Sequence, residues 1–173
     1  MDALIHVIRC FDDPLLPHPE GSVNPVRDRE TVDLELQVRD LESVEKKILR
    51  LEKIAKSGDK DAKASIGVLQ RVREHLESFQ SVRTLSLSEE EKRQIQDLFL
   101  LTVKPVMFVC NVDDPSAATG NDYTSRFLES VAGEGAEVLI LAGRLESEIA
   151  ELEDAADRQA FLEDAGLQEP GVA

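Results

Sequence analysis

Aromatic residues are scarce in this sequence: it has no tryptophan, one tyrosine and six phenylalanines among 173 residues. Hydrophobic residues nevertheless make up 42%, so a core must be built mainly from leucine, valine, isoleucine and alanine. No apolar run approaches the roughly 18–20 residues that a membrane-spanning helix needs. The N-terminus, interrupted by His6 and Arg9, does not resemble a signal peptide. These absences predict a soluble globular protein of the cytoplasm with no membrane partner.

Residues that could react or bind metal are also few. The two cysteines, Cys10 and Cys110, each lie near the end of a strand-like run. Free buried thiols in a reducing compartment are the favoured interpretation, and a disulfide is the alternative. His6, His18 and His75 are scattered without metal-ligand spacing, and the C-terminal acids lack the spacing of a calcium loop. The sequence therefore predicts no metal site and no catalytic group.

Basic residues are outnumbered, with 20 lysines and arginines against 35 acids and a net charge of −15. Taken whole, this balance opposes non-specific binding to nucleic acid. The distribution is uneven, however. Residues 46–63 hold seven basic and three acidic residues, whereas residues 144–173 hold two basic and nine acidic. The chain can therefore present one basic end to an acidic partner.

Short apolar runs at 3–8, 106–110 and 138–141 predict strands buried on both faces. Helical patterns follow at 122–132, 144–152 and 157–165. Alternation of strands and helices predicts an α/β fold, a doubly wound parallel sheet of three strands. Nothing upstream of the first run could cover it or pair with it, so the predicted sheet is partial and belongs to a larger domain.

A long helical segment interrupts this pattern after the first strand. Apolar residues recur at spacings of three and four from Leu41 to Ala55, and again from Ala62 to Phe79. Only Ser57, Gly58 and Asp59 separate the two predicted helices, so these must be antiparallel and form a coiled-coil hairpin.

The hairpin defines the expected domains. Residues 27–85 form the inserted hairpin, and residues 1–26 and 86–173 form the partial sheet domain. A capping box of Ser88 and Glu91 predicts the start of a short helix after the hairpin.

Asn111-Val112-Asp113-Asp114 directly follows the second apolar strand. In doubly wound folds, ligands bind at the carboxyl ends of the strands. P-loop GTPases read guanine there with Asn-Lys-x-Asp. Here Val112 stands at the lysine position. By itself this tetrapeptide is more typical of a simple turn.

Longer segments carry a more specific resemblance. "HVIRCF", "VEKKILRLEKIAKSGDKDAKA", "LSLSEEEK", "LFLLTVKPVMFVCNVDD" and "FLEDAGLQEPG" resemble successive segments of the YchF, or Obg-like, ATPases. The resemblance covers residues 2–170 in order. It implies a nucleotide-binding G domain with an inserted coiled-coil hairpin, a following TGS domain, ribosome association and a preference for ATP over GTP.

The same resemblance implies site residues. Asn111 and Val112 match the base-contacting pair, Asp114 takes the place of the family's usual glutamate, and Ala142 and Gly143 match the segment whose backbone touches the base. The shorter Asp114 leaves the choice of base open, so ATP is expected and GTP remains an alternative.

The phosphate-binding loop G-x-x-x-x-G-K-[ST] is absent from the sequence, and with it the hydroxyl that binds Mg²⁺. We therefore expect Mg²⁺ to be bound only by a full-length protein, and no nucleotide hydrolysis by this chain alone. The partners implied are the missing N-terminal half of the G domain and the TGS domain.

The basic end of the hairpin offers a second site. Lys53, Lys56, Lys60 and Lys63, the tip lysines, are expected to contact the ribosome or RNA, with ordinary solvated lysines as the alternative. Two functions remain open. One is the central part of a ribosome-associated, ATP-binding P-loop NTPase; the other is a non-enzymatic coiled-coil module that binds RNA or a protein.

Overall fold

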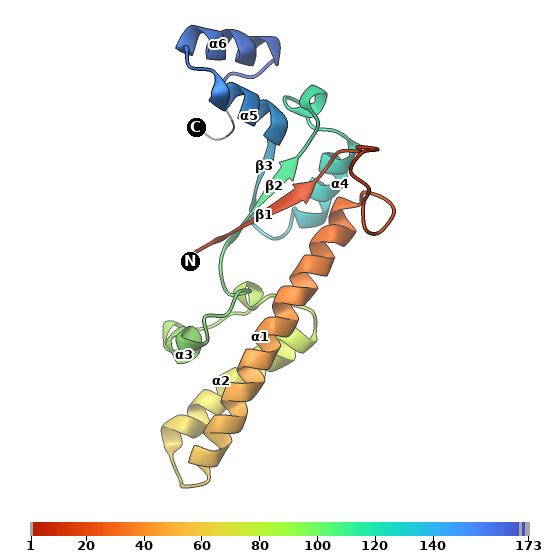
Figure 1. The fold of residues 1–173 in the computed structure, drawn as a ribbon. Helices are drawn as coiled ribbons and strands as arrows, with labels where there is room; N and C mark the ends of the chain where they lie inside the picture. The colour runs from red at the N-terminus through yellow and green to blue at the C-terminus, as the bar shows by residue number, and fades with distance from the viewer. Residues whose placement is uncertain (1, 170, 172–173) are drawn as a thin grey trace. The chain divides into compact units, whose positions relative to one another are not determined.

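The computed structural model describes residues 2–169 and 171 (Figure 1). The elements follow one another along the chain as β1 (Leu4–Arg9), α1 (Pro25–Ala55), α2 (Lys60–Glu77), η1 (Val82–Thr84), α3 (Glu89–Ile95), η2 (Gln96–Leu98), β2 (Val106–Asn111), η3 (Asp114–Ser116), α4 (Asp122–Val131), β3 (Glu137–Leu141), α5 (Gly143–Glu151) and α6 (Ala155–Asp164). The η elements are 3₁₀ helices. The predicted order of strands and helices is confirmed.

Two compact units make up the chain. Apart from the first two residues, the sheet unit comprises Ala3–Arg29 and Val106–Ala173, and the helical unit comprises Glu30–Pro105. The expected boundary at residue 86 differs from this division, because residues 86–105 group with the helical unit. Leu87, Ile95 and Leu100 pack into the core of that unit, which explains the grouping.

In the sheet unit the strands are parallel, in the order β1-β2-β3. Val7 pairs with Val109, and Val109 pairs with Leu139. The predicted α/β class with three parallel strands is therefore confirmed. Helices connect the strands as crossover segments, as parallel pairing requires.

Burial alternates along β1, as the two-residue period of a strand requires. Ile8 is 2% exposed and belongs to the core, whereas Ile5 and Val7 are 69% and 61% exposed. The expectation that this strand is covered on both faces is therefore wrong for the described residues. The covered face forms one core with α4, α5 and α6, made of Ile8, Cys10, Phe108, Cys110, Val112, Ala117, Phe127, Val131, Ala142, Leu145, Ile149 and Leu162.

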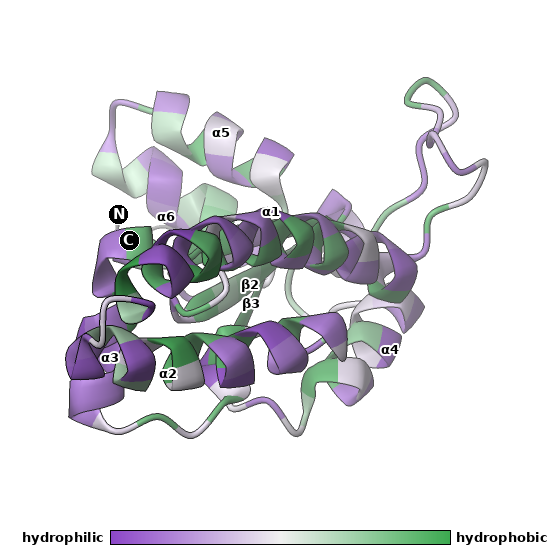
Figure 2. Cartoon of the chain, turned by 90° about the horizontal axis from the view of Figure 1, so that it is seen from below, coloured by the Kyte–Doolittle hydropathy of each residue, from purple (hydrophilic) through white to green (hydrophobic). Residues whose placement is uncertain are grey.

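In the helical unit, α2 runs back alongside α1 after a reversal over residues 56–59 (Figure 1). Gly58 has a φ of 93°, which a glycine adopts without steric cost, and the Asp59 carboxylate caps α2 by accepting from the Ala62 amide. Hydrophobic stretches alternate with hydrophilic ones along both helices (Figure 2). Their shared core contains Val44, Ile48, Val68, Leu69, Val72, Leu76, Val82, Ile95 and Leu100. Coiled-coil packing itself stays a prediction.

The apolar seam of α2 ends earlier than its spacing predicts. The helix stops at Glu77, and Phe79 has a φ of 57° and is 70% exposed. Phe79 occupies the left-handed position that commonly ends a helix and that glycine usually fills. Its side chain therefore leaves the row of buried residues, and the expectation that it belongs to the seam is wrong.

A buried carboxylate joins three segments of the helical unit. Asp40 on α1 is only 2% exposed. Its Oδ1 accepts from the Leu101 amide at 2.8 Å, and its Oδ2 accepts from the amide and the hydroxyl of Thr102, both at 2.7 Å. The Thr102 hydroxyl also accepts from the Val82 amide at 3.2 Å, which brings in η1. Three neutral donors thus satisfy a charge that would be costly to bury alone.

We expect Asp40→Asn to destabilise the chain by about 2 kcal/mol, because an amide NH₂ would face donors that now bond to Oδ2. Urea unfolding followed by circular dichroism measures this change. Glu45→Gln on the exposed side of α1 is the matched control, expected to stay within about 0.5 kcal/mol of the parent. Equal stability of the two variants would contradict the role given to Asp40.

Candidate nucleotide-base site

Asn111 ends the central strand of the sheet unit and is tied to both neighbouring strands. Its carbonyl accepts from the Cys10 amide at 2.8 Å, just beyond β1. The following residue, Val112, donates its amide to the Leu141 carbonyl of β3 at 2.9 Å. The carboxyl ends of all three strands therefore meet around Asn111, at the sheet edge where α/β folds bind ligands.

The side chain of Asn111 reaches the start of α5. Its Oδ1 accepts from the Gly143 amide at 2.9 Å. This bond satisfies one of the N-terminal amides that a helix cannot pair internally. A Cβ at Gly143 would lie 3.2 Å from Asn111 Oδ1, which is tighter than an ordinary contact. Glycine thus permits the close approach, and the structure brings together two of the residues predicted for base contact.

Asp114, the first residue of η3, lies near the positively charged side chain of Arg144 on α5. Its Oδ2 lies 3.8 Å from Nε of Arg144, and the same Nε donates to Oε1 of Glu148 at 3.0 Å. The bond to Glu148 and then the nearby Asp114 charge raise the pKa of the Arg144 guanidinium. Arg144 is 78% exposed, so these contacts lie in solvent and contribute little stability. Asp114 remains partly accessible to a ligand.

The other two predicted residues offer little surface. Val112 is 4% exposed and Ala142 is 1% exposed, and both belong to the core of the sheet unit. Ala142 is the N-cap residue of α5 and precedes Gly143 directly. Contact with a base at these positions would depend on the backbone and on the shape that the buried side chains impose.

Sequence reasoning missed a structural residue beside this edge. The Asn121 side chain accepts from the Tyr123 and Thr124 amides and donates Nδ2 to the Cys10 carbonyl at 2.8 Å. It therefore caps α4 and fixes the chain after β1. The signal was present, because Asn121 and Thr124 form a capping box at the usual spacing.

Two thiols lie together in the core of the sheet unit, but the described residues hold no group suited to a metal ion. Cys10 and Cys110 are free and buried, and their mutual hydrogen bond together with burial raises the pKa of Cys10. No cluster of three or more His, Cys, Asp or Glu side chains suited to a metal ion occurs among residues 2–169 and 171. Within the same residues, no helix is both long and apolar enough to cross a membrane.

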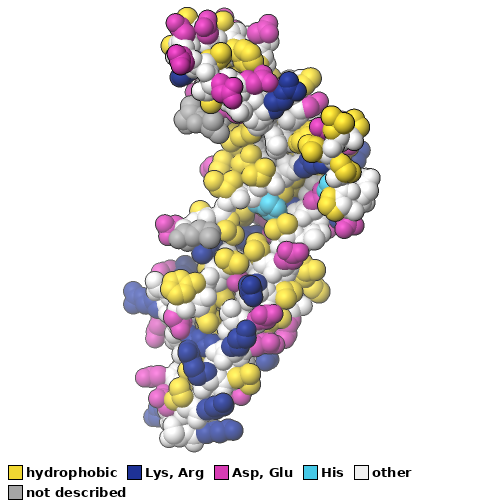
Figure 3. All heavy atoms as spheres, in the orientation of Figure 1, with side chains coloured by type: hydrophobic (Ala, Val, Ile, Leu, Met, Phe, Trp, Pro, Cys, Tyr) yellow, Lys and Arg dark blue, Asp and Glu magenta, His cyan; other side chains and the backbone are white. Residues whose placement is uncertain are grey.

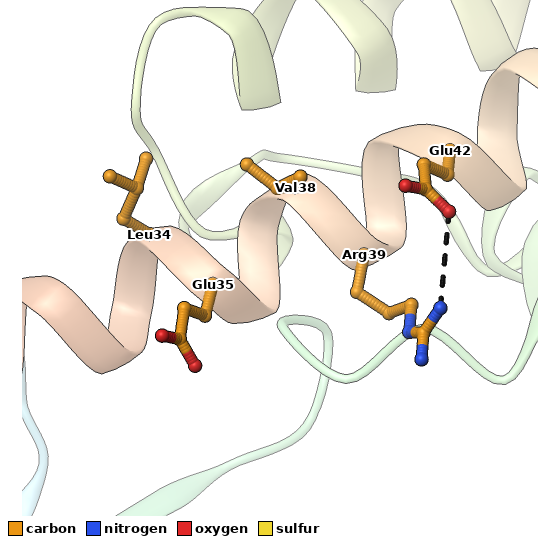
Figure 4. Close-up of a pocket in the computed structure, with 5 residues that line it drawn as sticks. All are labelled: Leu34, Glu35, Val38, Arg39 and Glu42. Carbon is orange, nitrogen blue, oxygen red and sulfur yellow. Dashed lines mark ion pairs between the residues drawn. The ribbon is translucent and has the colours of Figure 1, made fainter.

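Two shallow pockets lie away from the predicted base contacts. One is lined by a single helix, α1, through Leu34, Glu35, Val38, Arg39 and Glu42 (Figure 4). Arg39 and Glu42 form an ion pair of 3.9 Å at its rim. The other is lined by the end of β1 and the loop that follows it, including Arg9 and His18. His18 Nε2 lies 2.9 Å from an Asp28 carboxylate oxygen. Neither contains Asn111 or Gly143.

The tip lysines are exposed, and Lys and Arg side chains gather over this end of the helical unit (Figure 3). In the described structure none of the four lies in an ion pair, whereas Lys46 pairs with Glu42 and Lys47 with Asp97. Four lysines without an ion-pair partner among the described residues therefore lie near the reversal between α1 and α2.

A parallel sheet with Asn111, Asp114 and Gly143 at its carboxyl edge places the chain among α/β proteins whose fold binds ligands at that edge. No family model matches the chain. It is 42% identical over 174 residues to a ribosome-binding ATPase YchF of Bacillus subtilis, with 99% of this chain and 47% of the relative covered. The ribosome-binding ATPase YchF of Escherichia coli O157:H7 is 41% identical over 171 residues, with the same coverage.

Structure comparison agrees with these similarities. The YchF GTPase of Schizosaccharomyces pombe matches with a TM-score of 0.86 and 25% identity, over 97% of this chain and 47% of that protein. The resemblance to the YchF family is therefore confirmed. The chain spans about half the length of the curated relatives it matches.

The bond between Asn111 and Gly143 gives a direct prediction. Asn111→Ala removes the acceptor, so we expect exchange of the Gly143 amide hydrogen to accelerate about five- to tenfold, the equivalent of one lost hydrogen bond. Hydrogen exchange monitored by NMR reports this amide. Asp113→Ala, a change at an exposed neighbour, is the control that should leave the rate unaltered. An unchanged rate in Asn111→Ala would contradict the bond.

Proposed function

We propose that this chain is the central part of a ribosome-associated, cytoplasmic nucleotide-binding protein of the YchF type and supplies the base-contacting half of its site. The observation that carries the proposal is the hydrogen bond between Asn111 Oδ1 and the Gly143 amide. The family resemblance assigns both of these strand ends to contact with the nucleotide base, and the bond supports a shared role for them. The names of the curated relatives, ribosome-binding ATPase YchF, support the same assignment.

Base recognition rests on Asp114 and the backbone around Gly143. The Asp114 carboxylate can accept from the N6 amino group of adenine, or from N1–H and N2–H of guanine. Val112 replaces the lysine of the GTPase motif and packs into the core, so no cation covers the base from this position. ATP is therefore the proposed nucleotide, with GTP as the alternative that Asp114 permits.

The phosphate contacts must come from sequence that this chain lacks. None of its 173 residues forms the glycine-rich loop with Lys and Ser or Thr that holds phosphates and Mg²⁺. The exposure of Ile5 and Val7 supports covering of that sheet face by the missing N-terminal half of the G domain. The TGS domain is the other part proposed from the resemblance.

Because only base contacts remain, we expect nucleotide binding no tighter than about 1 mM, with adenosine bound as well as ATP. No hydrolysis is expected. NMR titration should move the amide signals of Gly143 and Asp114 similarly with either ligand, and these shifts should be lost in Asn111→Ala. Micromolar affinity, a strong preference for ATP over adenosine, or Mg²⁺-dependent release of phosphate by the purified chain would each overturn the proposal.

The tip lysines are the proposed contact with ribosomal RNA. Reversing Lys53, Lys56, Lys60 and Lys63 to glutamate should weaken co-sedimentation with ribosomes and flatten its dependence on salt, because fewer counterions are released on binding. Reversal of Lys92, which pairs with Glu89, serves as the control. An unchanged salt slope would remove the tip from the interface. Ribosome binding by a chain with no affinity for nucleotides would favour the alternative, a non-enzymatic interaction module.

A further inference from the structure

Two phenylalanines of the helical unit combine backbone strain with exposure. Phe79 and Phe99, with φ values of 57° and 50°, are the non-glycine residues with positive φ in the described chain. Their side chains are 70% and 78% exposed, so packing does little to offset the strain. A bulky residue in this region is an outlier, and such strain is often retained where a residue has a function.

Phe99 belongs to a segment that contacts basic residues of α1. It directly follows η2, whose Asp97 Oδ1 lies 2.5 Å from Lys47 Nζ. The same Nζ donates to the Gln94 carbonyl at 2.6 Å, so Lys47 holds this segment against α1. Arg50, one turn further along α1, is 66% exposed and lies 3.9 Å from Asp97 Oδ2. The segment that contains Phe99 is thus held against the part of α1 that carries Lys47 and Arg50.

A row of cations continues from this point. Lys46, Arg50 and Lys53 are exposed and recur at spacings of four and three, which places them on one side of the helix. Lys46 also forms an exposed ion pair with Glu42, at 3.6 Å. They span seven residues, or roughly 10 Å at the helical rise of 1.5 Å per residue. Lys53 is the first of the tip lysines. Arg50, at the middle of the row, lies near Asp97 of the Phe99 segment, and the row ends at the tip.

Phe79 has a different setting. The last turn of α2 that precedes it contains Glu74 and Glu77, and Glu77 lies 3.6 Å from Arg73. The Phe79 carbonyl accepts from the Gln37 side chain at 3.4 Å. Phe79 thus matches Phe99 in residue type, backbone conformation and exposure, but its neighbouring helical turn is acidic.

We propose that Phe99 stacks on an unpaired base of single-stranded RNA whose phosphates lie along Lys46, Arg50 and Lys53. An aromatic face next to a basic groove is the combination that single-strand binding uses, since every base has a π-face to stack and every nucleotide carries a phosphate. This inference rests on the proposed RNA contact of the tip and extends it to a second element.

A fluorescent reporter tests the contact directly, because the sequence contains no tryptophan. Phe99→Trp and Phe79→Trp each introduce a single indole into the full 173-residue chain. Titration with single-stranded oligouridylate at low salt should quench the indole at position 99, because a stacked base contacts the ring. The indole at position 79 should be unaffected. Duplex RNA, whose bases are already stacked on each other, should quench neither.

Loss of the ring gives the second measurement. Phe99→Gly should weaken oligouridylate binding about tenfold, whereas Phe79→Gly should leave it unchanged. Glycine accepts positive φ without steric cost, so neither variant should lower the thermal midpoint substantially. A weakened binder that remains folded therefore identifies a contact residue.

The outcomes separate this inference from the proposed function. If the tip reversals weaken RNA binding but Phe99→Gly does not, the tip contact stands and the stacking role of Phe99 is wrong. Equal quenching at positions 79 and 99 also overturns the stacking role, as does a parent chain that does not bind oligouridylate. In either case, ribosome co-sedimentation of the tip reversals tests the tip contact independently. If Phe99→Gly weakens ribosome binding while oligouridylate binding is unchanged, Phe99 occupies a protein pocket instead.

Discussion

The parallel pairing of β2 with both β1 and β3 is the constraint on which the candidate site depends. Asn111, the last residue of β2, uses its carbonyl for the chain after β1 and its side chain for the start of α5. A shift of β2 by one residue would turn Asn111 toward the core face and move Phe108 out of it. Because Phe108 is fully buried, the hydrophobic core fixes the register, and the register in turn positions the polar edge.

In the helical unit, the positions of the segments relative to α1 are fixed in another way. Apolar seams between α1 and α2 are non-directional and tolerate sliding, whereas Asp40 has directional bonds with Leu101 and Thr102. A buried carboxylate without its donors would cost several kcal/mol. The segment that leads from η2 toward β2 is therefore held at one point of α1, and Phe99 is held in the same stretch of chain.

Features encoded locally were predictable from the sequence, and features that depend on side-chain direction were not. The Ser88–Glu91 capping box is confirmed because it depends on two residues three positions apart. The family resemblance implied that Asn111 and Gly143 belong to one site, and the parallel strands bring their two strand ends together. The end of α2 at Glu77 was missed because neither glycine nor proline marks it. The Asp114–Arg144 contact was missed because it depends on the orientation of exposed side chains.

The acidic residues at the carboxyl edge of this sheet are compatible with the proposed contact to a base. Asp12 and Asp13 follow β1, and Asp113 and Asp114 follow β2, so the carboxyl edge is lined by acids. Arg144 lies between Asp114 and Glu148, and its charge is already shared by two carboxylates. A triphosphate placed here would meet net repulsion, whereas an uncharged base could donate hydrogen bonds to the same oxygens. In the proposed site, a nucleotide would place its base at this edge and direct its phosphates away from these carboxylates.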